Sequence, residues 1–173
     1  DGVADHLLER GLQGLSLRPL AAALGTSDRM LLHYFRDKEE LLGAALERVS
    51  TRLLEAMGTS PPKARPFGEV VAGLVGVLRG PGMRPYLRIW LDLAAMSAAG
   101  DSSFDGHASK IAGTFREWLL RSIDEPAPRR RELLAAVAMA TLDGCALFDS
   151  LGLAETAEAA IEGLSLLANG PKR

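Results

Sequence analysis

The most restrictive feature of this sequence is a sharp corner at Gly25, between two short apolar segments at residues 17–24 and 28–35. The leucines of the first segment recur at helical spacing, so that they share one face of a helix. Ala21 is small enough to let a second helix approach closely, and Gly25 lacks the Cβ atom that would clash in a left-handed turn. The pattern predicts two short helices at a steep angle, which is the arrangement of a helix-turn-helix.

Polar residues at the starts of these segments supply the expected helix caps. Ser16 is placed to cap the second helix by accepting from the amide of Arg18, and Ser27 is placed to cap the third. Asp37 and Glu40 form an Asp-x-x-Glu capping box at the start of a fourth helix. These signals predict where the second, third and fourth helices begin.

The third helix is the element that can lie in a major groove of DNA. We expect Leu31 and Tyr34 to face inward, with Phe35 just behind them. The residues left exposed would then be Asp28, Arg29, Met30, Leu32 and His33. We interpret Arg29 and its neighbours as readers of base edges, and Lys38 at the start of the next helix as a phosphate contact.

The sequence is helical in pattern almost throughout. Hydrophobic residues make up 47% of the 173 residues and aromatic residues 5%, which favours a packed all-α fold over a sandwich or barrel. Breakers divide the chain into about nine helices, at about 1–10, 17–24, 28–35, 38–57, 67–78, 85–98, 107–123, 129–151 and 154–168, with a loop at 58–66. We expect a helix-turn-helix DNA-binding domain at residues 1–45 and a ligand-binding and dimerisation domain at 46–173.

Residues 11–46 resemble the N-terminal DNA-binding unit of the TetR family of transcriptional regulators. The matching features are the glycine after the first helix and the runs SLRPLA, ALGTS, YF and KEELL. The number and order of the remaining helices fit the same family. The resemblance implies a homodimer that binds a palindromic operator in double-stranded DNA, usually as a repressor, and is released by a small effector molecule.

The resemblance also implies DNA contacts from particular positions. They lie at the start of the second helix, the front of the recognition helix and the start of the fourth: Ser16, Arg18, Ser27, Asp28, Arg29, Met30 and Lys38. His33 joins this set because it is expected on the exposed face. Leu32 stands where the family very often has a tyrosine that contacts phosphate, so we expect that contact to be lost.

Apolar helix faces in the rest of the chain could enclose the effector, because ligand cavities are mostly apolar with a few polar anchors. The candidate pocket residues are Phe67, Tyr86, Trp90, Met96, His107, Phe115 and Trp118, with His107 as the polar anchor. An ordinary packed core is the alternative, since large apolar side chains are usually buried for packing alone. In the helix at 85–98, Arg84, Arg88 and Asp92 form one polar stripe, and the remaining apolar surface predicts a helix buried in a bundle.

The last two helices carry small and apolar residues at helical spacing. In the TetR family this helix pair meets its two-fold mate in a four-helix bundle, and an isologous interface needs such a self-complementary face. The resemblance therefore implies dimer contacts from Leu134, Val137, Thr141, Leu142, Cys145, Phe148, Ala157, Ile161 and Leu164. The alternative is that these faces pack only within the chain.

Other classes of function leave no signature. We find no nucleophile elbow, nucleotide-binding loop or His/Cys metal spacing, and so expect no enzyme, no cofactor and no metal site. A single cysteine, no signal peptide and no apolar run long enough to span a bilayer predict a cytoplasmic protein without a membrane partner. The net charge of −2 gives no overall basic field, so DNA binding must depend on local geometry. The alternative is a helical dimer that binds small molecules and has weak or no sequence-specific DNA binding.

Overall fold

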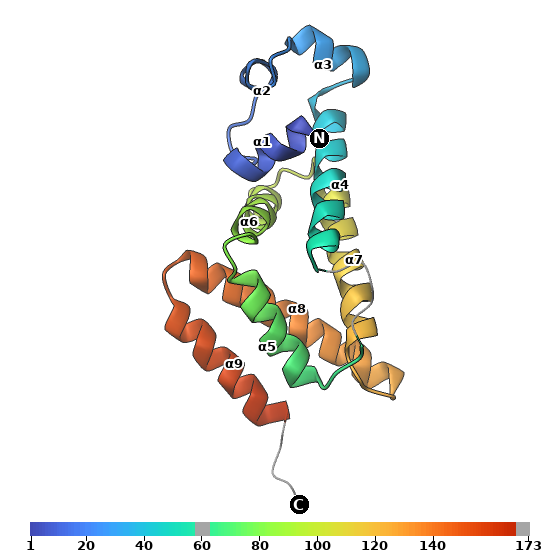
Figure 1. The fold of residues 1–173 in the computed structure, drawn as a ribbon, viewed down its shortest axis with the longest axis vertical. Coiled ribbons are helices and arrows are strands. Elements are labelled where there is room, and N and C mark those ends of the chain that lie inside the picture. The colour runs from blue at the N-terminus through green and yellow to red at the C-terminus, as the bar shows by residue number, and fades with distance from the viewer. Residues whose placement is uncertain (58–62, 169–173) are drawn as a thin grey trace, which may run out of the picture. The chain divides into compact units, whose positions relative to one another are not determined.

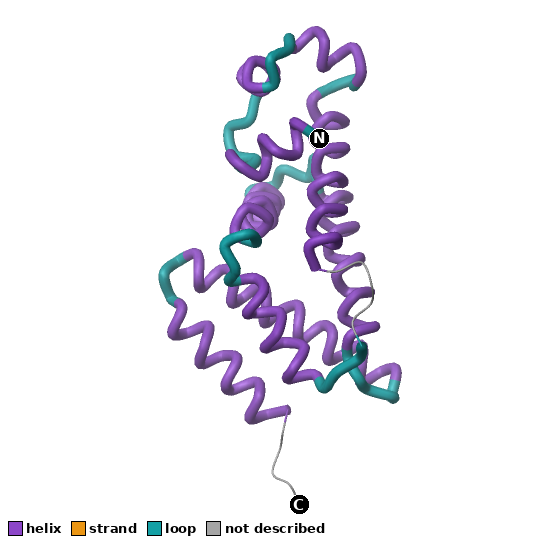
Figure 2. Tube along the Cα trace, viewed as in Figure 1, coloured by secondary structure: helices purple, strands orange, loops and turns teal. Residues whose placement is uncertain are grey.

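The structure is a computed structural model that describes residues 1–57 and 63–168. The described residues form nine α-helices (Figures 1 and 2): α1 (Gly2–Arg10), α2 (Leu17–Ala23), α3 (Asp28–Tyr34), α4 (Lys38–Met57), α5 (Phe67–Leu78), α6 (Arg84–Ala98), α7 (Asp105–Ser122), α8 (Pro128–Ser150) and α9 (Ala154–Ala168). The predicted all-α fold is confirmed, and the predicted helix ends differ from the observed ones by at most two residues. Residues 58–62 of the predicted loop lie outside the described residues.

Contacts along the chain divide it into two compact units. Unit 1 comprises Asp1–Thr59 and Arg84–Ala112, and unit 2 comprises Ser60–Met83 and Gly113–Arg173. The helix-turn-helix therefore lies within unit 1, together with α4, α6 and the first part of α7. The predicted boundary after residue 45 is a functional division that falls inside unit 1, and it stays a prediction.

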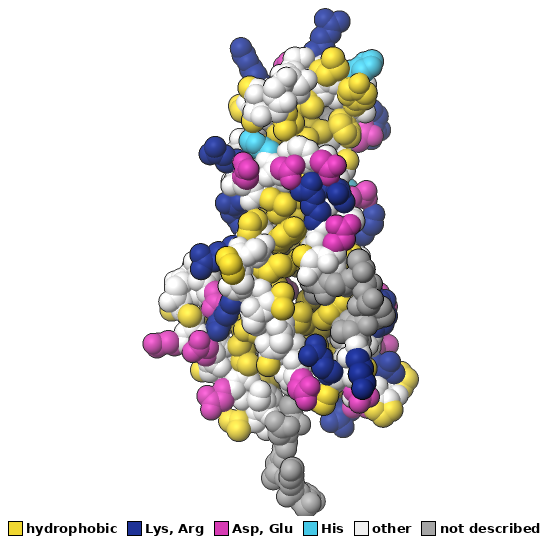
Figure 3. Space-filling model, in the orientation of Figure 1, with side chains coloured by type: hydrophobic (Ala, Val, Ile, Leu, Met, Phe, Trp, Pro, Cys, Tyr) yellow, Lys and Arg dark blue, Asp and Glu magenta, His cyan; other side chains and the backbone are white. Residues whose placement is uncertain are grey.

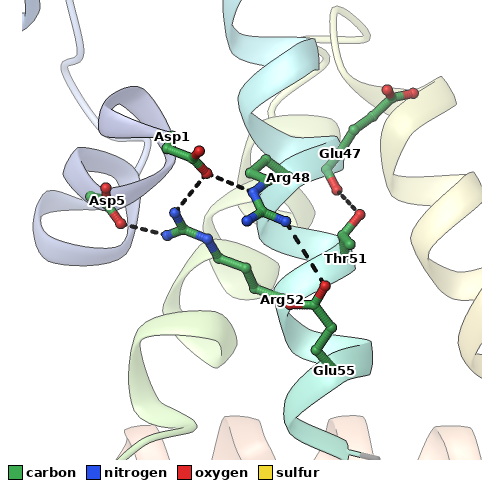
Figure 4. A network of polar contacts seen from close by, with 7 residues as sticks. All are labelled: Asp1, Asp5, Glu47, Arg48, Thr51, Arg52 and Glu55. Carbon is green, nitrogen blue, oxygen red and sulfur yellow. Dashed lines mark hydrogen bonds and ion pairs between the residues drawn. The ribbon is translucent and has the colours of Figure 1, made fainter. Parts of the chain in front are cut away.

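In unit 1, helix α1 packs against both α4 and α6. Aliphatic side chains form the core between these helices, and Leu7 of α1 is completely buried in it. Ion pairs join α1 to α4 at the surface (Figure 4): Arg48 Nε lies 2.6 Å from Asp1 Oδ1, and Arg52 donates to both Asp1 and Asp5. Because exposed ion pairs contribute little free energy, burial of the apolar face is what holds α1 on α4.

A second polar contact joins α6 to the end of α1. Arg88 Nη2 donates to the carbonyl of Leu8 at 2.6 Å, and the amide of Leu12 donates to Asp92 Oδ2 at 2.8 Å. Gly11 lies between them with φ +81°, and a Cβ atom on it would lie 2.7 Å from Asp92 Oδ2. The side chains of α6 thus satisfy backbone groups that have no partner at the end of a helix. We call these five residues the α6–α1 clamp.

Two apolar helices are less covered by the chain than the sequence predicts. Helix α6 buries Ile89 and Leu93, while its apolar residues Tyr86, Trp90 and Met96 are only partly buried against the core of unit 1. Helix α8 is the one helix in the described ranges that is long and apolar enough by composition to cross a membrane, which corrects the expectation that the chain has no such run. Length and composition are weak evidence for a membrane span, because apolar helices also serve packing between proteins.

In unit 2, helix α5 packs against α8 and α9, which also pack against each other (Figure 1). The buried face of α5 includes Val70 and Leu74. Arg79, just after α5, forms a two-pronged ion pair with Asp149 of α8, with N–O distances of 2.8 and 3.0 Å, and reaches Glu158 of α9 at 3.3 Å. The hydrogen bonds that Arg79 donates to Asp149 raise the pKa of its guanidinium, which stays charged.

Candidate nucleic-acid interface

Helices α2 and α3 meet at Gly25, as the sequence predicts. Gly25 has φ +66°, in the region that favours glycine, and the amide of Thr26 donates to the carbonyl of Ala21 at 2.9 Å. Ala21 is buried in a small core with Leu31 of α3 and Leu41 of α4. That core holds α3 by one face and leaves its other face in solvent.

The caps of α3 and α4 form largely as predicted. The Ser27 hydroxyl accepts from the amide of Met30 at 3.1 Å, and Asp37 Oδ1 accepts from the amide of Glu40 at 2.8 Å. The return half of the capping box differs, because Glu40 Oε2 accepts from the amide of Arg36 at 2.7 Å and from its Nε at 3.2 Å. Glu40 thus engages Arg36, one residue before the expected partner.

The solvent face of α3 carries the residues predicted to read bases. Asp28, Arg29, Leu32 and His33 line one shallow hollow in the surface, and we call these four residues the reading face. Met30 is also exposed, at 49%. In the space-filling view, hydrophobic, histidine and basic side chains share the surface over α2 and α3 (Figure 3). One side of α3 therefore combines polar and apolar groups that can meet a DNA groove.

Two arginine side chains at or near the reading face have no partner among the described residues. The side chains of Arg18 and Arg29 bond to no other residue in the described part of the chain. Asp28 Oδ1 accepts from the amide of Arg29 at 3.0 Å, so this carboxylate is engaged at the start of its own helix. Two guanidinium groups are therefore available to phosphates or base edges.

The starts of α2 and α4 lie close together through Lys38. Its Nζ donates to the carbonyl of Leu15, which ties the segment before α2 to the start of α4. Ser16 stands at the start of α2 with extended backbone, φ −130° and ψ 154°, but the expected side-chain cap is not formed. Pro19 has no amide, which leaves the first turn of α2 with fewer donors for a cap. Lys38 thus has a positioning role that sequence reasoning missed.

Tyr34 does not face inward, which corrects the prediction. Its side chain is 74% exposed, whereas Phe35 packs against the core that contains Leu31. Helix α3 ends at Tyr34, and the extended backbone of Phe35, with φ −127° and ψ 135°, lets the phenyl ring take the inward position. The Tyr34 ring contacts the ring of His33 edge to face, with centroids 5.2 Å apart. The tyrosine ring is therefore in solvent beside His33, a member of the reading face.

Four of the predicted pocket residues belong to unit 1. Tyr86, Trp90 and Met96 are partly buried against the core that joins α1, α4 and α6. His107 packs tightly on α4, where its Nε2 lies 2.5 Å from the position that a Cβ atom on Gly43 would occupy. The glycine therefore makes the room for the imidazole. Packing within unit 1 accounts for these four side chains.

The other three predicted pocket residues belong to unit 2. Phe67 and Trp118 are each 8% exposed, and the rings of Phe115 and Trp118 stack with centroids 6.2 Å apart and an interplanar angle of 11°. Trp118 Nε1 is buried and has no hydrogen-bond acceptor among the described residues. A buried donor without an acceptor is unfavourable by about 1–3 kcal/mol, which makes it a position of interest for a ligand. No group of three or more His, Cys, Asp and Glu in residues 1–57 and 63–168 is placed to hold a metal ion.

The predicted dimer residues are distributed over buried and accessible positions. Leu142, Cys145 and Ala157 are buried within unit 2, where the Cys145 Sγ lies 3.8 Å from the carbonyl of Ala157 and burial raises the pKa of the thiol. Packing of α8 on α9 thus accounts for these three. Val137 is 41% exposed, and the partly exposed members are Leu134, Thr141, Phe148, Ile161 and Leu164.

Sequence reasoning missed the more exposed apolar residues of α8 and its end. Leu133, Leu147 and Leu151 are 51%, 46% and 63% exposed. Leu133 and Val137 are four residues apart, and so are Leu147 and Leu151. Residues four apart lie on the same side of a helix. That spacing was readable in the sequence. Because α8 is apolar on more than one side, the sequence could not say which side the chain covers.

Comparison with known proteins finds a family match for the N-terminal part of the chain. Residues 4–45 match the family model of bacterial regulatory proteins, tetR family, and this segment runs from α1 into the start of α4. A crystal structure of a transcriptional regulator from Rhodococcus sp. Rha1 is similar, with a TM-score of 0.71 and 25% sequence identity. That similarity covers 92% of this chain and 88% of the other. None of the curated proteins matches the chain.

Proposed function

We propose that this chain, which belongs to the TetR family of bacterial regulatory proteins, represses transcription by binding a palindromic operator as a homodimer. A small, largely apolar effector would release it. Membership of the family makes the chain a DNA-binding transcription regulator with a helix-turn-helix. The observation that carries operator binding is the reading face of α3, which lies opposite the small core and presents an arginine whose side chain bonds to no described residue.

We assign base reading to Arg29 and phosphate contacts to the residues around it. A guanidinium without an internal partner can donate two parallel hydrogen bonds to guanine O6 and N7. Arg18 of α2 and Lys38 of α4 are assigned to contacts with the phosphate backbone of DNA. The side chain of Tyr34 is exposed, and we assign its hydroxyl a further donor to a phosphate oxygen.

The homodimer is supported by the apolar surface that unit 2 leaves uncovered. Val137 and Leu147 on α8 and Leu151 just after it are each more than 40% exposed, and exposed apolar patches mark sites of association. We assign a second copy of the chain, rather than a bilayer, to this surface. Asp143 and Asp149 lie on the same helix, and charged side chains are costly at bilayer depth.

The effector proposal depends on unit 2. The rings of Phe115 and Trp118 stack, and Phe67 is buried in the same unit. The Trp118 indole N–H lacks an acceptor within the described residues. An effector with an apolar body and one hydrogen-bond acceptor would satisfy that donor. His107, predicted as the polar anchor, belongs to unit 1 and is assigned to packing on Gly43 instead.

Release from DNA requires that the effector binds two arrangements of the protein with different affinity. We propose that α4 and α6 carry the difference, because both pack on α1 within unit 1. A change in the tilt of α4 would alter the spacing of the two recognition helices in the dimer. An effector that binds the chain and leaves operator affinity unchanged would contradict this mechanism.

Selection of bound sites from a random duplex library, at low and moderate salt, tests the function. An enriched palindrome with two half-sites, retained at moderate salt, is the expected outcome. Binding without enrichment, lost at moderate salt, would leave only nonspecific attraction to phosphates and would refute the proposal. The alternative, a helical dimer that binds small molecules without reading DNA, is favoured by the excess of acidic over basic residues in 1–57. A role on DNA implies a cytoplasmic location.

A further inference from the structure

The reading face contains one residue whose role the DNA contacts above leave open. Leu32 is 44% exposed and lies among Asp28, Arg29 and His33, all of which line the same hollow. Its neighbour Leu31 is buried and supplies the packing of α3 on the small core. Leu32 is therefore not needed to hold the helix, and its methyl groups face the same side as the polar readers.

Some polar groups around Leu32 already have a hydrogen-bond partner within the chain, and others do not. The Asp28 carboxylate accepts from the amide of Arg29, and the Ser27 hydroxyl accepts from the amide of Met30. The guanidinium of Arg29 bonds to no described residue, and the His33 ring makes a ring contact with Tyr34. The Arg29 guanidinium is thus the charged group on this face that is available to acceptors on nucleic acid.

An exposed leucine between two cationic or hydrogen-bonding side chains needs an apolar partner to be favourable in a groove. On the floor of the major groove, the thymine 5-methyl group is the apolar feature that distinguishes one base pair from another. Burying Leu32 against that methyl group removes apolar surface from water on both sides. Arg29 lies one turn away and lines the same hollow, so a base pair next to that thymine would be within its reach.

We propose that Leu32 reads the 5-methyl group of a thymine in each operator half-site, next to a guanine read by Arg29. This inference rests on the proposed function, because it needs a specific operator. The leucine that departs from the family pattern is then a specificity residue and not a lost contact. The same chemistry would accept 5-methylcytosine, which carries its methyl group at the same place on the ring.

The test starts from the enriched operator and replaces each thymine of the half-site by uracil, which removes only the methyl group. At one position we expect Kd to rise about fourfold for one half-site and about 15-fold for both, from ~0.8 kcal/mol per buried methyl group. At the same position, 5-methylcytosine should bind tighter than cytosine by a similar factor. A uracil effect without a 5-methylcytosine effect would overturn a methyl contact.

Variants assign the effect to the side chain. Leu32→Ala should bind the thymine and uracil operators equally, whereas the conservative Leu32→Met should keep the discrimination. Thermal unfolding should be the same for both variants and the wild type, because Leu32 lies outside the core. Loss of discrimination in Met30→Ala instead of Leu32→Ala would overturn the assignment, since Met30 is also an exposed apolar residue of α3.

Different results would refute the proposed function and the role of Leu32. No enriched site in the selection would refute the proposed function. An enriched palindrome that tolerates uracil at every thymine would leave the regulator intact and refute only the role of Leu32.

Discussion

Replacement of Gly11 by alanine tests the α6–α1 clamp most directly. Gly11 has φ +81° and ψ −173°, a region that glycine alone populates readily, so an alanine there costs about 1–3 kcal/mol of backbone strain. The new methyl group would also stand 2.7 Å from Asp92 Oδ2 and displace it from the amide of Leu12. An unpaired amide costs about 1–3 kcal/mol more. We therefore expect Gly11→Ala to lower the free energy of unfolding by about 2–6 kcal/mol.

Gly14→Ala is the matched control, because Gly14 also has positive φ, +65°, but no atom lies within 4 Å of a Cβ placed on it. It should cost only the strain, about 1–2 kcal/mol. Urea unfolding followed by circular dichroism measures both, at one fixed protein concentration because a dimer gains apparent stability with concentration.

A double-mutant cycle separates the clash from the strain. In an Asp92→Ala background the amide of Leu12 has already lost its acceptor, so Gly11→Ala should cost only the strain. Equal costs for Gly11→Ala in the two backgrounds, or a cost no larger than that of Gly14→Ala, would refute the clamp.

Three further predictions concern DNA, association and pH. Arg29→Ala should weaken operator binding by about 1–3 kcal/mol and relax base choice, measured by fluorescence anisotropy on matched and mismatched sites; equal loss on all sequences would make Arg29 a phosphate contact. Leu147→Glu should give monomers in sedimentation velocity, whereas Val77→Glu on α5, at the same 46% exposure, should not; a dimer that survives Leu147→Glu contradicts the proposed interface. The hydrogen bond from Arg52 holds the pKa of Asp5 below its usual 3.8, so its contribution to stability is complete above that value and is lost as pH falls through the lower folded pKa. Asp5→Asn should therefore flatten the acid limb of unfolding below about pH 4, and an unchanged limb would count against the pair.

Local signals predicted the helices well, because each acts over three or four residues. Ser27 reaches the amide of Met30, Asp37 reaches the amide of Glu40, and Gly25 takes its positive φ at the corner. Such hydrogen bonds depend only on residues a few positions apart, so the sequence alone is enough to predict where these helices begin and end. The helix-turn-helix and the resemblance to its family followed from the same short stretch.

Predictions about side-chain direction were less reliable at helix ends. Tyr34 and Phe35 are adjacent aromatic residues, and either could have faced the core. The helix ends between them, and the extended backbone of Phe35 gives the buried position to the phenyl ring. A change of one residue in the helix end thus exposes the tyrosine, whose hydroxyl is the less costly group to leave in water.

The sequence by itself determined the helical fold, the corner at Gly25 and the solvent face of α3 as far as His33, since these depend on periodicity and on bonds between near neighbours. Only the tertiary structure decided that Asp92 and Arg88 cap the end of α1, because their partners lie 80 residues away. It also decided which apolar side of α8 the chain covers. Both sides of that helix gain from leaving water, and the choice depends on where α5 and α9 pack.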